Sequence, residues 1–371
     1  MDIFKRTDWL LLGSAFLISL AGLSVMYGYG NEATFAAKQA VWLLVGVAAF
    51  FIASGIDFRF LRQTWFAISI YALALALLAL LFVVGSVFQG AQSWFDFGGF
   101  AVQPADPAKL ALIIVLAKYF SRRHIEIAHV KHLLVSGAYA LLIFALLFFQ
   151  PDFGSAVIVA GLWVGMVLVA GIPLRHLLLL IGAGVAAALL LWTFALAPYQ
   201  KERIVSFIHP LADIQGTGYN AFQSTVAVGS GGLLGKGIGY GTQSRLQFLP
   251  EHETDFIFAA FAEEWGFLGS LLLFTLYGVL IWRIVVSAQE GATNFETLFA
   301  LGVAVLFTVH GVIHIGMNIG LLPVTGTTLP FMSYGGSHLV TGYLMLGILQ
   351  AMRRYSRIVH EDERHEVIGV S

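Results

Sequence analysis

Asp255 stands at the boundary between a polar stretch of the sequence and an apolar one, and it is the first candidate for chemistry. It follows the segment 251–254, and Ala259, Ala262 and Gly266 come after it at helical spacing on the same face. One interpretation is a groove of small residues topped by a carboxylate, a group that can accept a proton in catalysis. The other is an aspartate that stabilises the positive end of a helix above a closely packed face. The sequence leaves both interpretations open.

Lys109 is the second candidate, because it lies near the start of another apolar segment. Asp106 suits the N-cap of a helix there, and Pro107 suits its first turn. A cation in the first turn opposes the helix dipole, and near hydrocarbon it requires an acidic partner. We therefore predict an ion pair between Lys109 and Asp106, Asp152 or Asp255. A structural pair and a role in anion binding are equally compatible with the sequence.

A glycine-rich segment, 229–241, contains a third cation, Lys236. It is not a phosphate-binding P-loop, which would need Gly at 230 and Ser or Thr at 237, where the chain has Ser230 and Gly237. Either the segment is a flexible outer loop, or its backbone amides and Lys236 approach a phosphate or a sugar.

Other polar residues interrupt the apolar segments. His310 and His314 are four residues apart, as in some metal sites, but without a third ligand in the sequence we favour two buried, hydrogen-bonded histidines. Glu263 and Glu264 diverge by about 100° on a helix, so they cannot both face one site, and we expect at least one to pair with a cation. The hydroxyls of 333–337 could cap a helix or bind a ligand.

The elements that must position these residues are membrane helices. The chain has 371 residues, 58% of them hydrophobic and 11% charged, and its mean hydropathy of +0.85 excludes soluble, secreted and disordered classes. We predict an all-α polytopic membrane protein with ten transmembrane helices in one integral membrane domain, 1–371. The expected spans are 10–28, 38–56, 63–86, 107–120, 132–150, 154–171, 175–198, 256–286, 296–320 and 335–352.

The distribution of basic residues predicts the orientation of these spans. Thirteen Lys and Arg residues fall on the side of the N-terminus and five on the other side. Positive residues are enriched in cytoplasmic loops, so both termini are expected in the cytoplasm. A large extracytoplasmic loop, 199–254, then joins the seventh and eighth helices, and 353–371 forms a cytoplasmic tail. The absence of cysteine excludes disulfides and thiolate chemistry, and a net charge of −1 suggests no nucleic-acid partner.

Several short motifs together resemble the SEDS family (shape, elongation, division and sporulation) over nearly the whole chain. The resemblance is carried by Gln103-Pro104 with Pro107-Ala108-Lys109, Gln150-Pro151-Asp152-Phe153-Gly154, Gly218-Tyr219-Asn220 with Gln223-Ser224, Gly229-Ser230-Gly231-Gly232, Gly235-Lys236-Gly237, Pro250-Glu251 with Thr254-Asp255-Phe256, Leu322-Pro323-Val324-Thr325-Gly326, and Leu329-Pro330-Phe331 with Ser333-Tyr334-Gly335-Gly336-Ser337. The segment 321–337 and the short cytoplasmic ends resemble the rod-shape branch more than the division branch. Asp106 departs from the usual Glu and His314 from the usual Asn, which leaves the role of position 314 unassigned.

The resemblance implies an enzyme of the bacterial cytoplasmic membrane that polymerises lipid II into glycan strands during cell elongation, with its active site on the extracytoplasmic side. It also implies a complex with a class B penicillin-binding protein, a transpeptidase, and other elongation proteins are possible partners. Asp255 matches the family's catalytic aspartate and would act as the base. The other candidates for binding the substrate are Asp106, Lys109, Asp152, Arg203, Gln223, Ser224, Lys236, Ser333, Tyr334 and Ser337, of which Lys109, Arg203 and Lys236 would balance the diphosphate charge. No cofactor is evident, and the sequence has no dedicated metal site, although a divalent cation could assist the diphosphate.

Two other functional classes remain. A lipid II flippase would use the charges within the membrane to guide the head group. A non-catalytic scaffold for a transpeptidase would tolerate neutralisation of Asp255 without loss of glycan synthesis.

Overall fold

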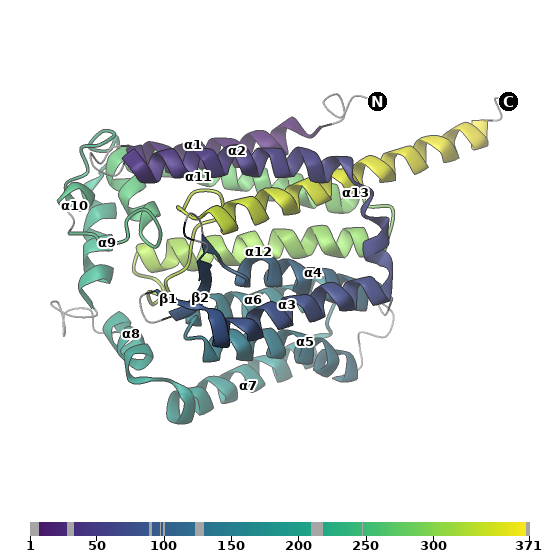
Figure 1. The fold of residues 1–371 in the computed structure, drawn as a ribbon, viewed down its shortest axis with the longest axis horizontal. Coiled ribbons are helices and arrows are strands. Elements are labelled where there is room, and N and C mark those ends of the chain that lie inside the picture. The colour runs from purple at the N-terminus through teal and green to yellow at the C-terminus, as the bar shows by residue number, and fades with distance from the viewer. Residues whose placement is uncertain are drawn as a thin grey trace.

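The computed structural model describes residues 7–27, 33–88, 91–96, 98, 101–122, 130–208, 218–246 and 248–368. Long helices lie side by side along one direction and form a bundle (Figure 1). In chain order the helices are α1 (Trp9–Tyr27), α2 (Ala33–Gly55), the 3₁₀ helix η3 (Phe58–Arg62), α3 (Thr64–Val84), α4 (Ala105–Ser121), α5 (Val130–Phe149), α6 (Phe153–Val169), α7 (Leu174–Leu190), the π-helical turn η4 (Leu191–Ala195), α8 (Pro198–Ile208), α9 (Gly218–Ser230), α10 (Thr242–Arg245), α11 (Ile257–Gln289), α12 (Asn294–Asn318) and α13 (Gly336–Ile368).

Each apolar segment expected to cross the membrane coincides with one of these helices. In the part of the chain that the structure describes, seven helices are long and apolar enough to span a bilayer: α1, α2, α3, α5, α7 continued by η4, α11 and α12. The count of ten stays a prediction. It depends on α4 and α6, which have 17 residues each, the lower limit for a crossing, and on α13, whose first half alone is apolar.

The two ends of the bundle differ in what they carry. α1 begins and α13 ends at the same end, whereas α8, α9 and α10 lie at the opposite end (Figure 1). A small antiparallel sheet, β1 (Ser86–Phe88), β2 (Ala91–Asp96) and β3 (Ala101–Val102), also lies at that opposite end. The described part of the predicted loop 199–254 includes the helices α8, α9 and α10, and the predicted tail 353–371 continues α13 as far as Ile368.

Helix α4 is enclosed by other helices, and this explains how it carries charged residues. It packs against α3, α5, α12 and α13, and nearly every side chain from Ala105 to Ala117 is buried, including the charged Lys109. By contrast, the stretch 181–190 of α7 is exposed along its whole length, as expected of a helix that faces lipid. The fold thus places Lys109 inside the protein rather than in hydrocarbon, where an ammonium is costly.

Candidate active site

Asp255 lies two residues before the first residue of α11, and the last residue of α12 fixes its main chain. The Asn318 side chain is fully buried and donates a hydrogen bond from Nδ2 to the Asp255 carbonyl at 3.0 Å. Its Oδ1 accepts a hydrogen bond from the Ala259 N–H, also at 3.0 Å. One amide therefore joins Asp255 to the first turn of α11.

The segment between α12 and α13 forms the other wall around Asp255. A Cβ placed on Gly326 would lie 3.4 Å from Asp255 Oδ2, and Gly326 has a φ of +71° that favours glycine. The Ser333 hydroxyl donates to the Thr254 carbonyl at 2.8 Å. We call Asp255, Asn318, Gly326, Ser333 and Tyr334 the Asp255 cluster.

Tyr334 is bonded to the segment before Asp255 through its main chain, and its ring packs against α2. Its N–H donates to the Glu253 carbonyl at 2.8 Å, and its half-buried ring packs edge-on against Phe35. Burial, and then the nearby Glu253 carboxylate, raise the pKa of Tyr334 above its ordinary value. The phenol therefore stays protonated at neutral pH and can donate a hydrogen bond to a ligand.

The two histidines of α12 hold the wall that contains Gly326. His314 Nδ1 lies 2.6 Å from the Thr327 carbonyl, and His310 Nδ1 lies 3.3 Å from the Thr328 carbonyl. Since a carbonyl oxygen only accepts, both Nδ1 atoms carry the proton. The interpretation of two buried, hydrogen-bonded histidines is confirmed. Among the described residues, no three His, Asp or Glu side chains are grouped so as to hold a metal ion.

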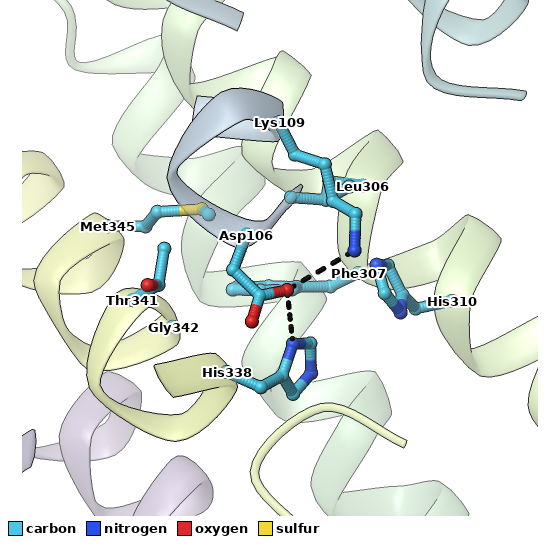
Figure 2. A pocket seen from close by; sticks show the side chains of 9 residues that line it. All are labelled: Asp106, Lys109, Leu306, Phe307, His310, His338, Thr341, Gly342 and Met345. Atoms are coloured by element: carbon cyan, nitrogen blue, oxygen red, sulfur yellow. Dashed lines mark hydrogen bonds and ion pairs between the residues drawn. The ribbon is translucent and has the colours of Figure 1, made fainter. Parts of the chain in front are cut away.

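The predicted ion pair of Lys109 is with Asp106. Lys109 Nζ and His338 Nδ1 both reach the same oxygen of Asp106 at 3.2 Å (Figure 2). The His310 and His338 rings are 5.2 Å apart, and the four residues line a cavity of ≈ 10 Å³, about the room that one water molecule needs. We call Asp106, Lys109, His310 and His338 the Asp106 cluster.

Two further candidates, Asp152 and Ser337, are connected through Gln103, which precedes α4. Asp152 caps α6 through a bond from the Ser155 N–H to Oδ1 at 3.0 Å, and its Oδ2 accepts from Gln103 Nε2 at 3.1 Å. The Ser337 hydroxyl donates to the Gln103 carbonyl at 3.4 Å. Gln103 thus links Asp152 to Ser337.

The glycine-rich segment is docked against α11. Lys236 Nζ lies 2.7 Å from Glu263 Oε1, so the expectation that one of the adjacent glutamates pairs with a cation is confirmed. The N–H groups of Lys236 and Gly237 donate to the carbonyls of Glu263 and Glu264 at 3.0 Å, and the Gly239 N–H donates to a carboxylate oxygen of Glu264. These three amides are therefore committed to α11, which argues against their use in phosphate binding.

The small residues that follow Asp255 do not line an open groove. α11 bends at Gly266, where φ is +67°, and a Cβ there would lie 2.2 Å from the Gly235 nitrogen. A Cβ on Gly231 would lie 2.0 Å from the Ala262 carbonyl oxygen, and Ala259 is fully buried. The groove interpretation is wrong for this face, because close packing of two backbones explains the small side chains.

The remaining candidates lie on α8 and α9. The fully buried Ser224 donates from its hydroxyl to the Asn318 carbonyl at 2.8 Å, and Gln223 is half-buried beside it in α9. Arg203 belongs to α8, but its side chain lies outside the described residues.

The sequence analysis did not identify Asn318 or His338 as candidate site residues. Asn318 is the last residue of α12, His338 lies in the first turn of α13, and Asn318 follows His314 by one helical turn. A polar stripe at positions 310, 314 and 318 was therefore visible in the sequence. Its partners were not, because they lie on segments distant along the chain.

A family model described as a cell cycle protein, FtsW/RodA/SpoVE, matches residues 3–358. Stage V sporulation protein E of Bacillus subtilis is 35% identical over 353 residues, which cover 94% of each chain. The peptidoglycan glycosyltransferase MrdB of Escherichia coli is 32% identical over 366 residues, 96% of this chain and 97% of its own length.

Solved structures agree with this match. A chain of a peptidoglycan synthase complex that coordinates polymerization and crosslinking superposes with a TM-score of 0.81, at 32% identity over 94% of this chain and 98% of that one. The rod shape determining protein RodA of Thermus thermophilus superposes with a TM-score of 0.70, at 30% identity over 94% and 96%.

Proposed function

This chain belongs to the FtsW/RodA/SpoVE family of cell cycle proteins, and on that premise we propose that it is a peptidoglycan glycosyltransferase that polymerises lipid II during cell elongation. The observation that carries the proposal is the similarity along almost the entire chain to MrdB, a peptidoglycan glycosyltransferase. The Asp255 cluster supports it, since Ser333 and Tyr334 bond to the main chain of the two residues before Asp255, just ahead of α11.

We place the protein in the bacterial cytoplasmic membrane, with ten spans and the Asp255 cluster on the extracytoplasmic side. The start of α1 and the end of α13 share one end of the bundle, and thirteen of the twenty basic residues belong to that side. A lipid-linked sugar could then keep its lipid in the bilayer and its disaccharide beside α9 and α10.

In this proposal Asp255 is the general base. The 4-hydroxyl of an acceptor sugar attacks the anomeric carbon of the donor, and undecaprenyl diphosphate leaves with the electrons of the broken bond. Asp255 takes the hydroxyl proton as the new bond forms. A single displacement inverts the anomeric carbon and needs no carboxylate nucleophile. The Tyr334 hydroxyl, with Ser337 and Gln223, provides the proposed sugar contacts, whereas the buried Ser333 hydroxyl holds the segment behind them through its bond to Thr254.

Balance of the diphosphate charge is the second requirement of this reaction. The side chain of Lys236 is 28% exposed beside its buried partner Glu263, whereas that of Lys109 is only 4% exposed. We therefore assign direct contact with the phosphates to Lys236 and keep Arg203 as a second candidate. Lys109, with Asp106, supports the site from within the bundle.

The proposed partner is a class B penicillin-binding protein, a transpeptidase. The similar chain in the solved synthase complex belongs to an assembly that couples polymerization to crosslinking. On this chain we place the contact on the lipid-facing side of α11 and α12, where Phe267, Leu271 and Val312 are exposed.

A gel assay for glycan polymer tests the function. The full-length protein, reconstituted with its transpeptidase and supplied with lipid II, should produce long glycan strands. Translocation of lipid II across vesicles without polymer would identify a flippase. Polymer formation that persists when Asp255 is neutralised would identify a scaffold.

A further inference from the structure

The side chain of Asn318 uses its full set of donors within a few ångströms of Asp255. Nδ2 donates to the Asp255 carbonyl at 3.0 Å and to the His314 carbonyl at 2.8 Å. Oδ1 accepts from the Ala259 N–H at 3.0 Å. The residue is fully buried, so these bonds are not exchanged with water and each fixes a backbone group in place.

Asn318 also caps α11, which has no capping side chain of its own. The N-cap residue of α11 is Phe256, whose side chain cannot accept a hydrogen bond from the first turn. The N–H of Ala259, the third residue of the helix, is instead accepted by Asn318, which belongs to another helix. The cap of α11 and the carbonyl of Asp255 are thus held by the same amide.

The same face of α12 holds the opposite wall of the Asp255 cluster. His310 and His314, two turns and one turn before Asn318, bond to the Thr328 and Thr327 carbonyls. These carbonyls follow Gly326, the glycine that faces Asp255 Oδ2. Polar side chains at intervals of four residues on α12 therefore hold in place both the main chain of Asp255 and the backbone opposite its carboxylate.

The main chain of Asn318 is itself held by a hydrogen bond from α9. The buried hydroxyl of Ser224, on α9, donates to the Asn318 carbonyl at 2.8 Å. α9, α11 and α12 therefore meet at this one residue.

We propose that Asn318 is a positioning residue for the base, an inference that depends on the proposed function because it assigns Asp255 that role. Asn318 fixes the direction of the chain at Asp255 and the first turn of α11, and so aims the carboxylate at the acceptor hydroxyl. A misplacement of about 1 Å can reduce a rate by about 10²-fold. Loss of Asn318 should therefore act on the chemical step rather than on lipid II binding.

The test compares Asn318→Leu, which keeps the volume and removes the hydrogen bonds, with Gln350→Ala. Gln350 is a matched control, since its buried amide accepts from the Asp8 N–H at the far end of the bundle. In the reconstituted full-length protein with its transpeptidase and lipid II, we expect Asn318→Leu to lower kcat by about 10- to 100-fold. The KM for lipid II should stay within about twofold of wild type, and Gln350→Ala should keep both constants.

Two further variants keep the inference falsifiable if Asn318→Leu folds poorly. Ser224→Ala removes only the bond behind Asn318 and should lower kcat by about two- to tenfold at unchanged KM. Asn318→Leu added to Asp255→Asn should cause no further loss, because a positioning residue acts only through the base.

The outcomes separate the two claims. A normal kcat in both Asn318→Leu and Ser224→Ala, while Asp255→Asn is inactive, would overturn the inference and leave the proposed function standing. A fall in kcat together with a raised KM and a melting temperature below that of Gln350→Ala would show a merely structural role. Near-normal polymerisation by Asp255→Asn would instead refute the assignment of the base itself.

Discussion

Replacement of Lys109 by Met tests whether charge holds the Asp106 cluster together. The side chains of Lys109 and Asp106 are each 4% exposed, and their charged atoms lie 3.2 Å apart. Removal of one partner from such a buried pair costs about 3–5 kcal/mol, because the remaining charge is left uncompensated. His338 would stay bonded to the carboxylate, but it carries a charge only when protonated. At about 2 °C per kcal/mol, Lys109→Met should lower the melting temperature by about 6–10 °C.

The assay follows the melting of the purified full-length protein by tryptophan fluorescence, with lipid II polymerisation measured in parallel. We expect Lys109→Met to insert into the membrane but to polymerise poorly. The double variant Asp106→Asn/Lys109→Met is the matched control, because it removes both charges and should recover most of the lost stability. The reasoning would be refuted if Lys109→Met melted within about 2 °C of wild type, or if the double variant melted below the single one.

Three other predictions concern the rest of the molecule. A cysteine introduced at Ser230, in a chain that has none, should react with a membrane-impermeant thiol reagent added from outside; labelling only from the cytoplasmic side would end the topology proposed here. Lys236→Met should destabilise the protein more than Glu263→Gln. The first change leaves the fully buried Glu263 carboxylate without its cation, whereas the second leaves the Lys236 side chain, which is 28% exposed, without its anion. Melting temperatures in the opposite order would contradict this. Burial raises the pKa of Asp8, but hydrogen bonds and charge from Arg283 and its neighbours outweigh it and hold that pKa below the ordinary 3.8. A lowered folded-state pKa contributes stability that is present above pH 3.8 and is lost as the pH falls through the folded-state pKa. The difference in stability between wild type and Asp8→Asn, measured from pH 7 to pH 3, should therefore shrink at the acid end. A constant difference would show that Asp8 does not titrate with unfolding.

The helices α1 to α7, α11, α12 and the first half of α13 could be predicted from the sequence because each is an almost continuous apolar run, whereas α8, α9 and α10 were expected to be part of a loop. The ion pair of Lys109 was also within reach, since its partner Asp106 is one helical turn away and an ammonium near hydrocarbon requires a carboxylate. The pairing of Glu263 followed from the same argument, although the sequence did not identify Lys236 as its partner.

The parts that could not be predicted depend on contacts between distant segments. His338 meets Asp106 across 232 positions, and Asn318 meets Asp255 across 63, so neither pair has a local pattern. The small residues after Asp255 were compatible with a groove or with packing, and the close approach of Gly231 to Ala262 and of Gly235 to Gly266 decides for packing. No proline or other helix breaker lies beside Gly266 in the sequence, so the bend there could not be predicted.

The central claim is that Asp255 is the base of a glycosyl transfer, and single-turnover polymerisation by Asp255→Asn tests it most directly. The substitution keeps the shape of the side chain and removes its basicity, and a positioned base contributes about 10²- to 10⁴-fold. Lipid II polymerisation by the reconstituted variant with its transpeptidase should fall by at least about 10²-fold, while membrane insertion, partner binding and lipid II affinity stay nearly unchanged. Glycan synthesis at a near wild-type rate by a correctly inserted Asp255→Asn protein would contradict the account.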